Sequence, residues 1–199
     1  MNSFSVRDLH TALEGMIART RECEEELNAL DAELGDGDLG STLVSVAGAI
    51  EQSLESLVDD LGASLRQLSK VIGGISGSSF SSLLMVGLSS AGTVLHGKTA
   101  VSTDDCLQVW RTALTAMLAA SGARLGDKTL LDGMDSIAQA PPRVSWVDEV
   151  NRTIELFRPK ACRAGRARVA AERSIGRDDP GMVAMLRLIE GATGQRAAR

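Results

Sequence analysis

The chain has 199 residues, 44% of them hydrophobic and 24% charged, a balance that fits one globular domain over residues 1–199 with a full core. Its 21 Lys and Arg against 26 Asp and Glu give a formal net charge of −5, and aromatic residues make up only 3%. Nucleic-acid binding needs clustered positive charge and, for single strands, aromatic rings for stacking, so the composition argues against a nucleic-acid partner.

Three cysteines, Cys23, Cys106 and Cys162, stand far apart in the sequence and are odd in number. This spacing is typical of neither a disulfide framework nor a metal-binding Cys-x-x-Cys pair, so we expect a reducing environment. The first ten residues carry charges without an apolar signal-peptide core, and no stretch reaches the roughly 18 apolar residues that cross a bilayer. The sequence therefore predicts a cytoplasmic protein without a membrane partner.

The first predicted helix begins at a capping box formed by Ser5 and Asp8. Apolar residues between Val6 and Ile17 recur three and four positions apart, which places them on one helical face. We expect this helix to continue to about Leu30.

A second helix is expected after Gly40, and leucines between positions 54 and 68 continue the helical spacing on one or two further helices toward Val71. The uncharged run Val71–Gly97 contains six glycines and seven serines. That composition is typical of closely packed backbone and not of a lipid-facing helix.

The second half of the chain opens with an amphipathic pattern over Leu107–Leu118, which has helix-start signals at Ser102 and a plausible C-cap at Gly122. A short helix is expected over Leu130–Ala138, because the Pro141-Pro142 pair breaks the chain after it.

Two more helix starts follow. Ser145 and Asp148 form a capping box, and Pro159 predicts a kink or a helix boundary one residue before it. Asp179, with a proline next to it, begins the last helix. The sum is about eight helices and no convincing strand, which predicts an all-α fold.

The most informative stretch is a loop between two helices in which Asp31, Asp36 and Asp38 place three carboxylates within eight residues. Carboxylates this close repel one another unless a cation or solvent neutralises them, and Mg²⁺ takes oxygen ligands from Asp, phosphates and water. Intervening glycines allow sharp turns, and Gly40 with the two residues after it opens a helix whose N–H groups can face a phosphate. Together these features indicate a site for a metal ion and a phosphate.

Two other structures are compatible with an acidic loop: an exposed turn and a calcium-binding EF-hand. An exposed acidic turn stays open on composition alone. A calcium-binding EF-hand requires Glu at its twelfth position, but that position is Ala47 when counted from Asp36 and Thr42 when counted from Asp31. Calcium binding of the EF-hand type is therefore not expected.

A literal Walker A pattern spans Gly92–Thr99. A P-loop needs a buried strand before its first glycine and a helix opening at Lys98, whereas the helix-start signals come later, at Ser102. We therefore interpret the pattern as a surface loop between helices. His10 and His96 have no partners at metal-ligand spacing, and neither is assigned a function.

The run from Leu30 to Gly40 matches L-D-x-x-x-G-D-G-D-x-G and resembles the nucleotide-binding domain, or L subunit, of dihydroxyacetone kinases. Further segments agree with that family in the same order, and together they span residues 27–181. They are Gly73–Gly77, Gly126–Asp132, Gly165–Ala167, Glu172–Gly176 and Asp179–Gly181. The resemblance implies an antiparallel barrel of eight helices that holds Mg²⁺ and an adenine nucleotide, ADP or ATP, at one end.

The same resemblance implies roles for individual residues. Asp31, Asp36 and Asp38 are similar in position to the ligands of two Mg²⁺ ions that bridge the nucleotide phosphates. Nucleotide contacts are implied in the phosphate loop, the base pocket, the G-R-A motif and the closing segment. These residues are Leu39, Gly40, Ser41, Thr42, Ser76, Gly77, Thr129, Leu130, Arg166, Asp179, Pro180 and Gly181.

Some positions depart from the family pattern. Leu39 stands where many relatives carry His, Cys or Thr, Ser78–Ser81 replaces G-P-L-Y, Leu130 replaces Met, and Val169 replaces an aromatic residue. These departures leave the phosphoryl donor open: ATP itself, or a bound ADP that a phosphocarrier protein rephosphorylates.

The resemblance implies a Mg²⁺-dependent phosphotransferase subunit of the glycerone kinase type. Its substrate, dihydroxyacetone or a related hydroxyketone, is expected on a partner K-type subunit, because 199 residues filled by a nucleotide domain leave no room for a substrate-binding domain. The alternatives are a nucleotide-binding regulatory module without turnover and, with less support, a P-loop NTPase that uses the Walker-like segment.

Overall fold

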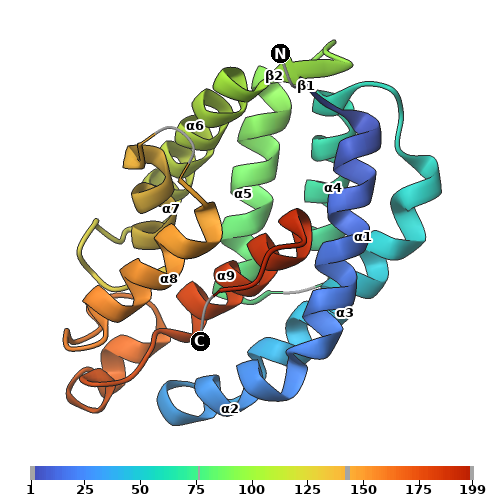
Figure 1. The fold of residues 1–199 in the computed structure, drawn as a ribbon. Coiled ribbons are helices and arrows are strands. Elements are labelled where there is room, and N and C mark those ends of the chain that lie inside the picture. Colours follow the sequence, from blue (N-terminus) through green and yellow to red (C-terminus); the bar gives the residue numbers. More distant parts are fainter. Residues whose placement is uncertain (1–2, 76, 142–143, 198–199) are drawn as a thin grey trace.

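The computed structural model describes residues 3–75, 77–141 and 144–197, and over this part of the chain it is almost entirely helical (Figure 1). Three short 3₁₀ segments, η1 (Leu54–Ser56), η2 (Arg166–Ala170) and η3 (Glu172–Ser174), lie in the connections. The α-helices are α1 (Val6–Glu22), α2 (Glu24–Leu34), α3 (Leu39–Ser53), α4 (Leu61–Ile75), α5 (Ser79–Val94), α6 (Thr103–Ser121), α7 (Leu130–Gln139), α8 (Trp146–Phe157) and α9 (Pro180–Thr193). The all-α prediction is confirmed.

Eight of these helices form a closed ring. Each packs against the next in the order α1, α3, α4, α5, α6, α7, α8 and α9, and α9 packs against α1 (Figure 1). Helix α2 lies outside this ring and contacts α3 and α9. The expected barrel of eight helices is therefore present, with α2 as an addition to it.

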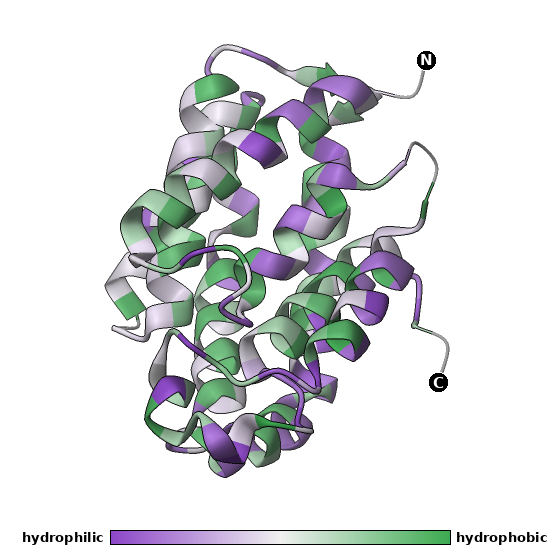
Figure 2. Ribbon diagram, turned by 90° about the vertical axis from the view of Figure 1, so that its left-hand side faces the viewer, coloured by the Kyte–Doolittle hydropathy of each residue, from purple (hydrophilic) through white to green (hydrophobic). Residues whose placement is uncertain are grey.

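The interior consists of two apolar clusters, as expected for helices that each bury one side; both hydropathy colours occur along most helices in Figure 2. One cluster, with Leu13 and Leu68, joins α1, α3 and α4. The other, with Leu131, Val150 and Met182, joins α7, α8 and α9 with parts of α5 and α6. No helix in the described ranges is both long and apolar enough to cross a bilayer.

Side-chain caps account for the predicted helix starts. Ser5 and Asp8 form both halves of a capping box, and Ser102 Oγ accepts a hydrogen bond from the Asp105 N–H at 3.1 Å. Ser145 Oγ likewise accepts from the Asp148 N–H, and Gly122 ends α6 with a φ of 68°. These helix starts are confirmed, although of the capping box predicted for Ser145 and Asp148 only the bond to the Ser145 side chain is present.

The end of the first helix was predicted wrongly. Helix α1 stops at Glu22 instead of continuing to Leu30, because Cys23 leaves the helical region with φ −106° and ψ 7°. Its N–H is shared between the carbonyls of Arg19 and Thr20, and its side chain is buried. Helix α2 can therefore turn away from α1 and pack on α3 and α9.

The expectation of no strand also needs correction. Two three-residue strands, β1 (Ser3–Ser5) and β2 (Ala100–Ser102), pair antiparallel with Phe4 opposite Val101. Segments this short carry too few residues for an alternating pattern to stand out.

Pro159 marks a helix boundary as predicted, since α8 ends at Phe157 and 3₁₀ segments follow later. Helix α7 spans Leu130–Gln139, close to the predicted helix. Of the predicted Pro141-Pro142 break, Pro142 lies outside the described residues.

The Walker-like segment Gly92–Thr99 does not form a P-loop. Gly92 lies inside α5, where a side chain would collide with the backbone of α4 at Gly62, and its carbonyl accepts a hydrogen bond from Arg66 Nη1 at 2.7 Å. The prediction of a surface loop holds only after Val94, where α5 ends. Gly92 therefore serves the close approach of α4 and α5, which agrees with the packing predicted for the small-residue run.

A second backbone approach joins the first and last helices of the ring. A side chain on Gly15 of α1 would meet the carbonyl of Gly191 on α9, and one on Gly191 would meet the carbonyl of Gly15 at 2.5 Å. Only glycine at both positions allows this spacing of α1 and α9.

Candidate functional site

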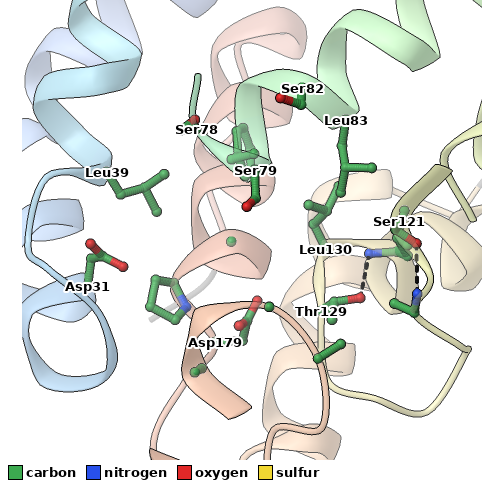
Figure 3. A pocket seen from close by; sticks show the side chains of 18 of the residues that line it. Asp31, Leu39, Ser78, Ser79, Ser82, Leu83, Ser121, Thr129, Leu130 and Asp179 are labelled. Atoms are coloured by element: carbon green, nitrogen blue, oxygen red, sulfur yellow. Dashed lines mark hydrogen bonds between the residues drawn. The ribbon is translucent and has the colours of Figure 1, made fainter. Parts of the chain in front are cut away.

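A cavity of about 530 Å³ opens at one end of the barrel (Figure 3). Its walls come from the ends of elements: the first residues of α3, α5, α7 and α9 and the last residues of α6 all line it. Helix α6, which ends here, packs between α5 and α7, which begin here, as an antiparallel barrel requires. Because helix N-termini carry partial positive charge, four of them at one cavity favour an anionic ligand.

The three predicted acidic residues meet at this cavity. Asp31 comes from α2, whereas Asp36 and Asp38 come from the loop that follows, and one carboxylate oxygen from each lies within 4.8 Å of the others. Asp31 Oδ2 accepts hydrogen bonds from the N–H groups of Gly37 at 2.8 Å and Asp38 at 3.2 Å. Gly37 has a φ of 79°, which a residue with a side chain rarely adopts.

This donor set fits the metal expected from the sequence. It consists of carboxylate oxygens, without a nitrogen or sulfur ligand, and Asp36 and Asp38 are exposed while Asp31 is half-buried. Hard cations such as Mg²⁺ prefer oxygen ligands and keep several water molecules, which an open carboxylate cluster permits.

The start of α3 is only partly at the cavity. Leu39 is buried and lines it, but Gly40, Ser41 and Thr42 do not. Gly40 packs against α2, and the Ser41 N–H donates to Asn28 Oδ1 at 3.1 Å. The Ser41 amide is thus already engaged, and the structure does not direct it to a phosphate.

Most of the other predicted residues converge on the cavity although they are far apart in the sequence. Gly77 precedes α5, Thr129 and Leu130 lie at the start of α7, and Asp179–Gly181 begins α9. Two predictions cannot be placed: Ser76 lies outside the described residues, and for Arg166 the structure describes only the backbone, at the start of η2.

One wall of the cavity was not predicted. Ser79, Ser82 and Leu83 lie at helical spacing on the face of α5 that is turned to the cavity (Figure 3). Val86 continues this face, and Phe80 adds an aromatic ring to the lining. The spacing was present in the sequence, but the small-residue run that contains it also fits helix packing. The result is a cavity with an acidic side and a largely apolar side.

Asp179 joins the acidic side from the start of α9. Its Oδ1 accepts a hydrogen bond from the Met182 N–H at 2.8 Å, which caps the helix. Burial raises the pKa of Asp179 to about 7, and the nearby carboxylates of Asp132 and Asp31 add to the rise, while Lys128 opposes it.

Asp132 orders the turn before α7. Its Oδ2 accepts a hydrogen bond from the Thr129 N–H at 2.8 Å, and Thr129 and Asp132 together form a capping box. Its Oδ1 accepts from the Gly126 N–H, so one carboxylate holds both ends of the turn. Burial raises the pKa of Asp132.

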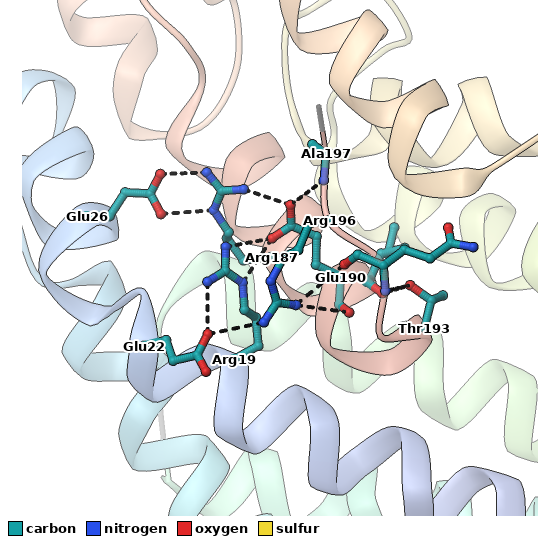
Figure 4. Close-up of polar contacts among 10 residues, drawn as sticks. Arg19, Glu22, Glu26, Arg187, Glu190, Thr193, Arg196 and Ala197 are labelled. Carbon is teal, nitrogen blue, oxygen red and sulfur yellow. Dashed lines mark hydrogen bonds and ion pairs between the residues drawn. The ribbon is translucent and has the colours of Figure 1, made fainter. Parts of the chain in front are cut away.

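A second cavity, of about 540 Å³, lies between α1, α2, α8 and α9 and is lined mainly by paired arginines and glutamates (Figure 4). Glu190 is almost fully buried there and accepts hydrogen bonds from Arg19, Arg187 and the Ala197 N–H. None of the predicted site residues lines this cavity.

Comparison with known proteins places these features in a family. The DAK2 domain model matches residues 33–194. The L-erythrulose 1-kinase of Mycolicibacterium smegmatis is 29% identical over 97% of this chain and 36% of its own length. The Listeria innocua protein named PEP-dependent dihydroxyacetone kinase 2, ADP-binding subunit DhaL, is 27% identical over 85% of each chain.

The fold has a solved counterpart. The crystal structure of the dihydroxyacetone kinase of C. freundii superposes with a TM-score of 0.74 and 24% identity, covering 94% of this chain and 34% of that one. This chain spans about a third of the length of that kinase and of the erythrulose kinase. Since the family model matches most of its residues, the chain belongs to the DAK2 domain family.

Proposed function

We propose that this chain is the nucleotide-binding subunit of a kinase for dihydroxyacetone or a related hydroxyketone. The observation that carries the proposal is the convergence of three carboxylates and four helix N-termini on one cavity. Carboxylates bind divalent cations, and helix N-termini favour phosphates, so the two together suit a metal-bound nucleotide. Residues 1–199 would form this single nucleotide domain.

Relatives support the choice of ligand. The Listeria innocua relative is named an ADP-binding subunit, and a C. freundii dihydroxyacetone kinase of the same fold was solved in complex with AMP-PNP and Mg²⁺. The apolar wall around Phe80, Leu83 and Val86 suits a nucleotide base, while the acidic side suits metal-bound phosphates.

Asp31, Asp36 and Asp38 would hold two Mg²⁺ ions in this proposal. When bound, these ions neutralise the charge on the transferred phosphoryl group. The chain itself provides positioning: Asp31 fixes the loop through two backbone N–H groups, and the start of α5 at Ser79 presents amides to the phosphates. Thr129–Leu131 and Asp179–Gly181 enclose the nucleotide from the opposite side.

The rest of the enzyme would lie on other chains. The hydroxyketone would be held on a K-type partner subunit, and the phosphoryl group would come from ATP or from ADP that a phosphocarrier protein rephosphorylates. The second arrangement is supported by the relatives named as subunits of PEP-dependent kinases.

A second candidate is a nucleotide-binding regulatory module without turnover. The observation that favours it is Leu39, whose buried apolar side chain at the cavity cannot donate a hydrogen bond to a phosphate. An assay that mixes the chain with a K-type subunit, a phosphoryl donor and a hydroxyketone distinguishes the two candidates. If the chain is a kinase subunit, the phosphorylated hydroxyketone forms only when the chain is present; if it is a regulatory module, its formation does not require the chain.

Calorimetric titration of ADP with and without Mg²⁺ tests the common part of both candidates. We expect binding to require Mg²⁺ and to be lost in Asp38→Asn, whose side chain makes no cap hydrogen bond to α3. Asp59→Asn, an exposed site outside the cavity, is the matched control, and Lys98→Ala tests the Walker-like segment. Unchanged binding in Asp38→Asn with loss in Lys98→Ala would reject the carboxylate site.

A further inference from the structure

Lys128 is the largest of the fully buried side chains, with 1% of its surface exposed. It is also the only non-glycine residue with a positive φ, 64°, in the ranges that the structure describes. A residue with a side chain adopts this conformation only where its surroundings hold it there, and such residues cluster at functional sites. Glycine would adopt this backbone conformation more easily, so the reason for a lysine at position 128 must lie in what its side chain does.

The side chain uses its whole hydrogen-bonding capacity on backbone carbonyls. Lys128 Nζ donates to the carbonyl oxygens of Arg158 at 3.1 Å, Lys160 at 2.8 Å and Ser174 at 2.7 Å. An ammonium group has three N–H donors, so all of them are engaged. Burial lowers the pKa of Lys128, but the three carbonyl acceptors favour the charged ammonium, because a neutral amine has only two N–H donors for them.

The three carbonyls belong to the two ends of one segment, residues 158–176, which connects α8 to the approach of α9. Further hydrogen bonds close the same loop, from the Gly176 N–H to the Arg158 carbonyl at 2.8 Å and from the Cys162 N–H to Ser174 Oγ at 2.8 Å. The middle of the segment, at Ala164, Gly165 and Ala167, lines the cavity.

Lys128 also adjoins the part of the cavity wall that α7 provides. It immediately precedes Thr129, the N-cap of α7, and both Thr129 and the following leucines line the cavity. The Arg163 N–H donates to the Asp127 carbonyl at 2.9 Å and adds a backbone link beside the ammonium. One residue thus connects the α7 wall to the 158–176 segment.

We propose that Lys128 is a positioning residue for nucleotide binding: its ammonium joins the two ends of segment 158–176 and holds residues 164–167 at the cavity. This inference rests on the proposed function. Because no N–H of the ammonium is left over, Lys128 acts through the segment and does not contact the nucleotide itself.

The test compares Lys128→Met, which keeps the length of the side chain and removes its charge, with Lys98→Met, an exposed lysine outside the cavity. Two readouts are taken well below the unfolding temperature: backbone hydrogen exchange of residues 161–175 and the Kd for ADP with Mg²⁺. In Lys128→Met we expect exchange in this segment to accelerate at least tenfold while α1 and α3 stay protected, and the Kd to rise at least tenfold. Lys98→Met should change neither.

Should Lys128→Met fail to fold, Lys128→Gly provides the second variant, since glycine relieves the positive φ and still lacks the ammonium. The proposal is overturned by a folded variant with wild-type Kd, by exchange that accelerates throughout the barrel, or by loss of folding in both variants, which would make Lys128 a support of the whole fold.

Failure of the proposed function looks different. In that case the wild-type chain itself does not bind ADP with Mg²⁺, and the positioning role for a nucleotide falls with it. The exchange measurement still shows whether Lys128 holds the segment.

Discussion

The two cavities are similar in volume but opposite in how their charges are arranged. The described residues that line the barrel-end cavity include four aspartates, Asp31, Asp36, Asp38 and Asp179, and no Lys or Arg. The second cavity is lined by three arginines and three glutamates, which pair with one another (Figure 4). Charges of both signs in contact neutralise one another without a ligand, whereas carboxylates gathered together need a cation or water.

Glu190 illustrates the balanced case. Burial by itself would raise its pKa, but hydrogen bonds from the Ala197 N–H and Arg19 outweigh burial, and the pKa is lowered. Asp179 illustrates the other case, since burial among carboxylates raises its pKa. In the second cavity, hydrogen bonds and arginines thus offset the cost of burying a carboxylate. In the barrel-end cavity this cost is not fully offset by the protein, and a bound cation would offset it.

The largest effect is expected from Glu190→Ala. Removing this carboxylate leaves Arg19 and Arg187 without their buried partner, and breaking a buried ion pair costs about 3 kcal/mol or more. Urea unfolding should show a correspondingly lower free energy of unfolding. A loss below about 1 kcal/mol would mean that the network contributes little to stability.

A rise in pKa from 3.8 to about 7 corresponds to about 4 kcal/mol, at about 1.4 kcal/mol per pKa unit. Because Asp179 is only half-buried, solvent screens part of this, and we expect Asp179→Asn to stabilise the Mg²⁺-free protein at pH 8 by about 2 kcal/mol. In the wild type the carboxyl ionises near pH 3.8 when unfolded and near 7 when folded, so stability falls as the pH rises through this window. Asparagine keeps a helix N-cap without the charge, and the two proteins should be equally stable near pH 3. Thermal unfolding of both proteins from pH 3 to 8 measures this difference in stability. If the stabilities of the two proteins changed in parallel with pH, the predicted role of the Asp179 charge would be wrong.

Mg²⁺ without nucleotide should stabilise the wild type and not Asp36→Asn/Asp38→Asn. At ten times its Kd, a ligand that binds only the folded state adds about 1.4 kcal/mol. Glu190→Ala, measured in the same titration, should keep the Mg²⁺ effect because its change lies in the second cavity. If Mg²⁺ stabilised the double variant as much as the wild type, the ion would bind at a site other than Asp36 and Asp38.

The smallest effect is expected from Glu22→Ala. This carboxylate pairs with Arg19 at 3.0 Å and Arg196 at 3.3 Å, but its side chain is 55% exposed. Exposed pairs contribute about 0–1 kcal/mol, so urea unfolding should change little compared with Glu190→Ala. A loss as large as that of Glu190→Ala would show that the network acts as one unit.

Local signals in the sequence predicted much of the fold. Capping residues such as Ser5 and Ser102 act within a few positions, so they mark helix starts reliably, whereas the bend at Cys23 follows from the packing of α2 on distant helices. The acidic loop was recognisable for the same reason, because its three carboxylates lie within eight residues.

Contacts between residues far apart in the sequence were harder to predict. Lys128 reaches carbonyls 30 to 46 positions away, and no spacing rule connects a lysine to backbone oxygens at such distances. The face of α5 at the cavity was hidden by composition, since serines and glycines suit both a helix contact and a binding wall. Such features depend on the assembled barrel.

The glycine contact between α1 and α9 has a consequence for the order in which the protein is made. The ring closes only when Gly191 meets Gly15, so a ribosome must finish the last helix before the barrel can seal. The same helix brings Asp179–Gly181 to the cavity. A nascent chain that ends at α8 therefore has neither a closed barrel nor a complete cavity, and both form together once α9 has been added.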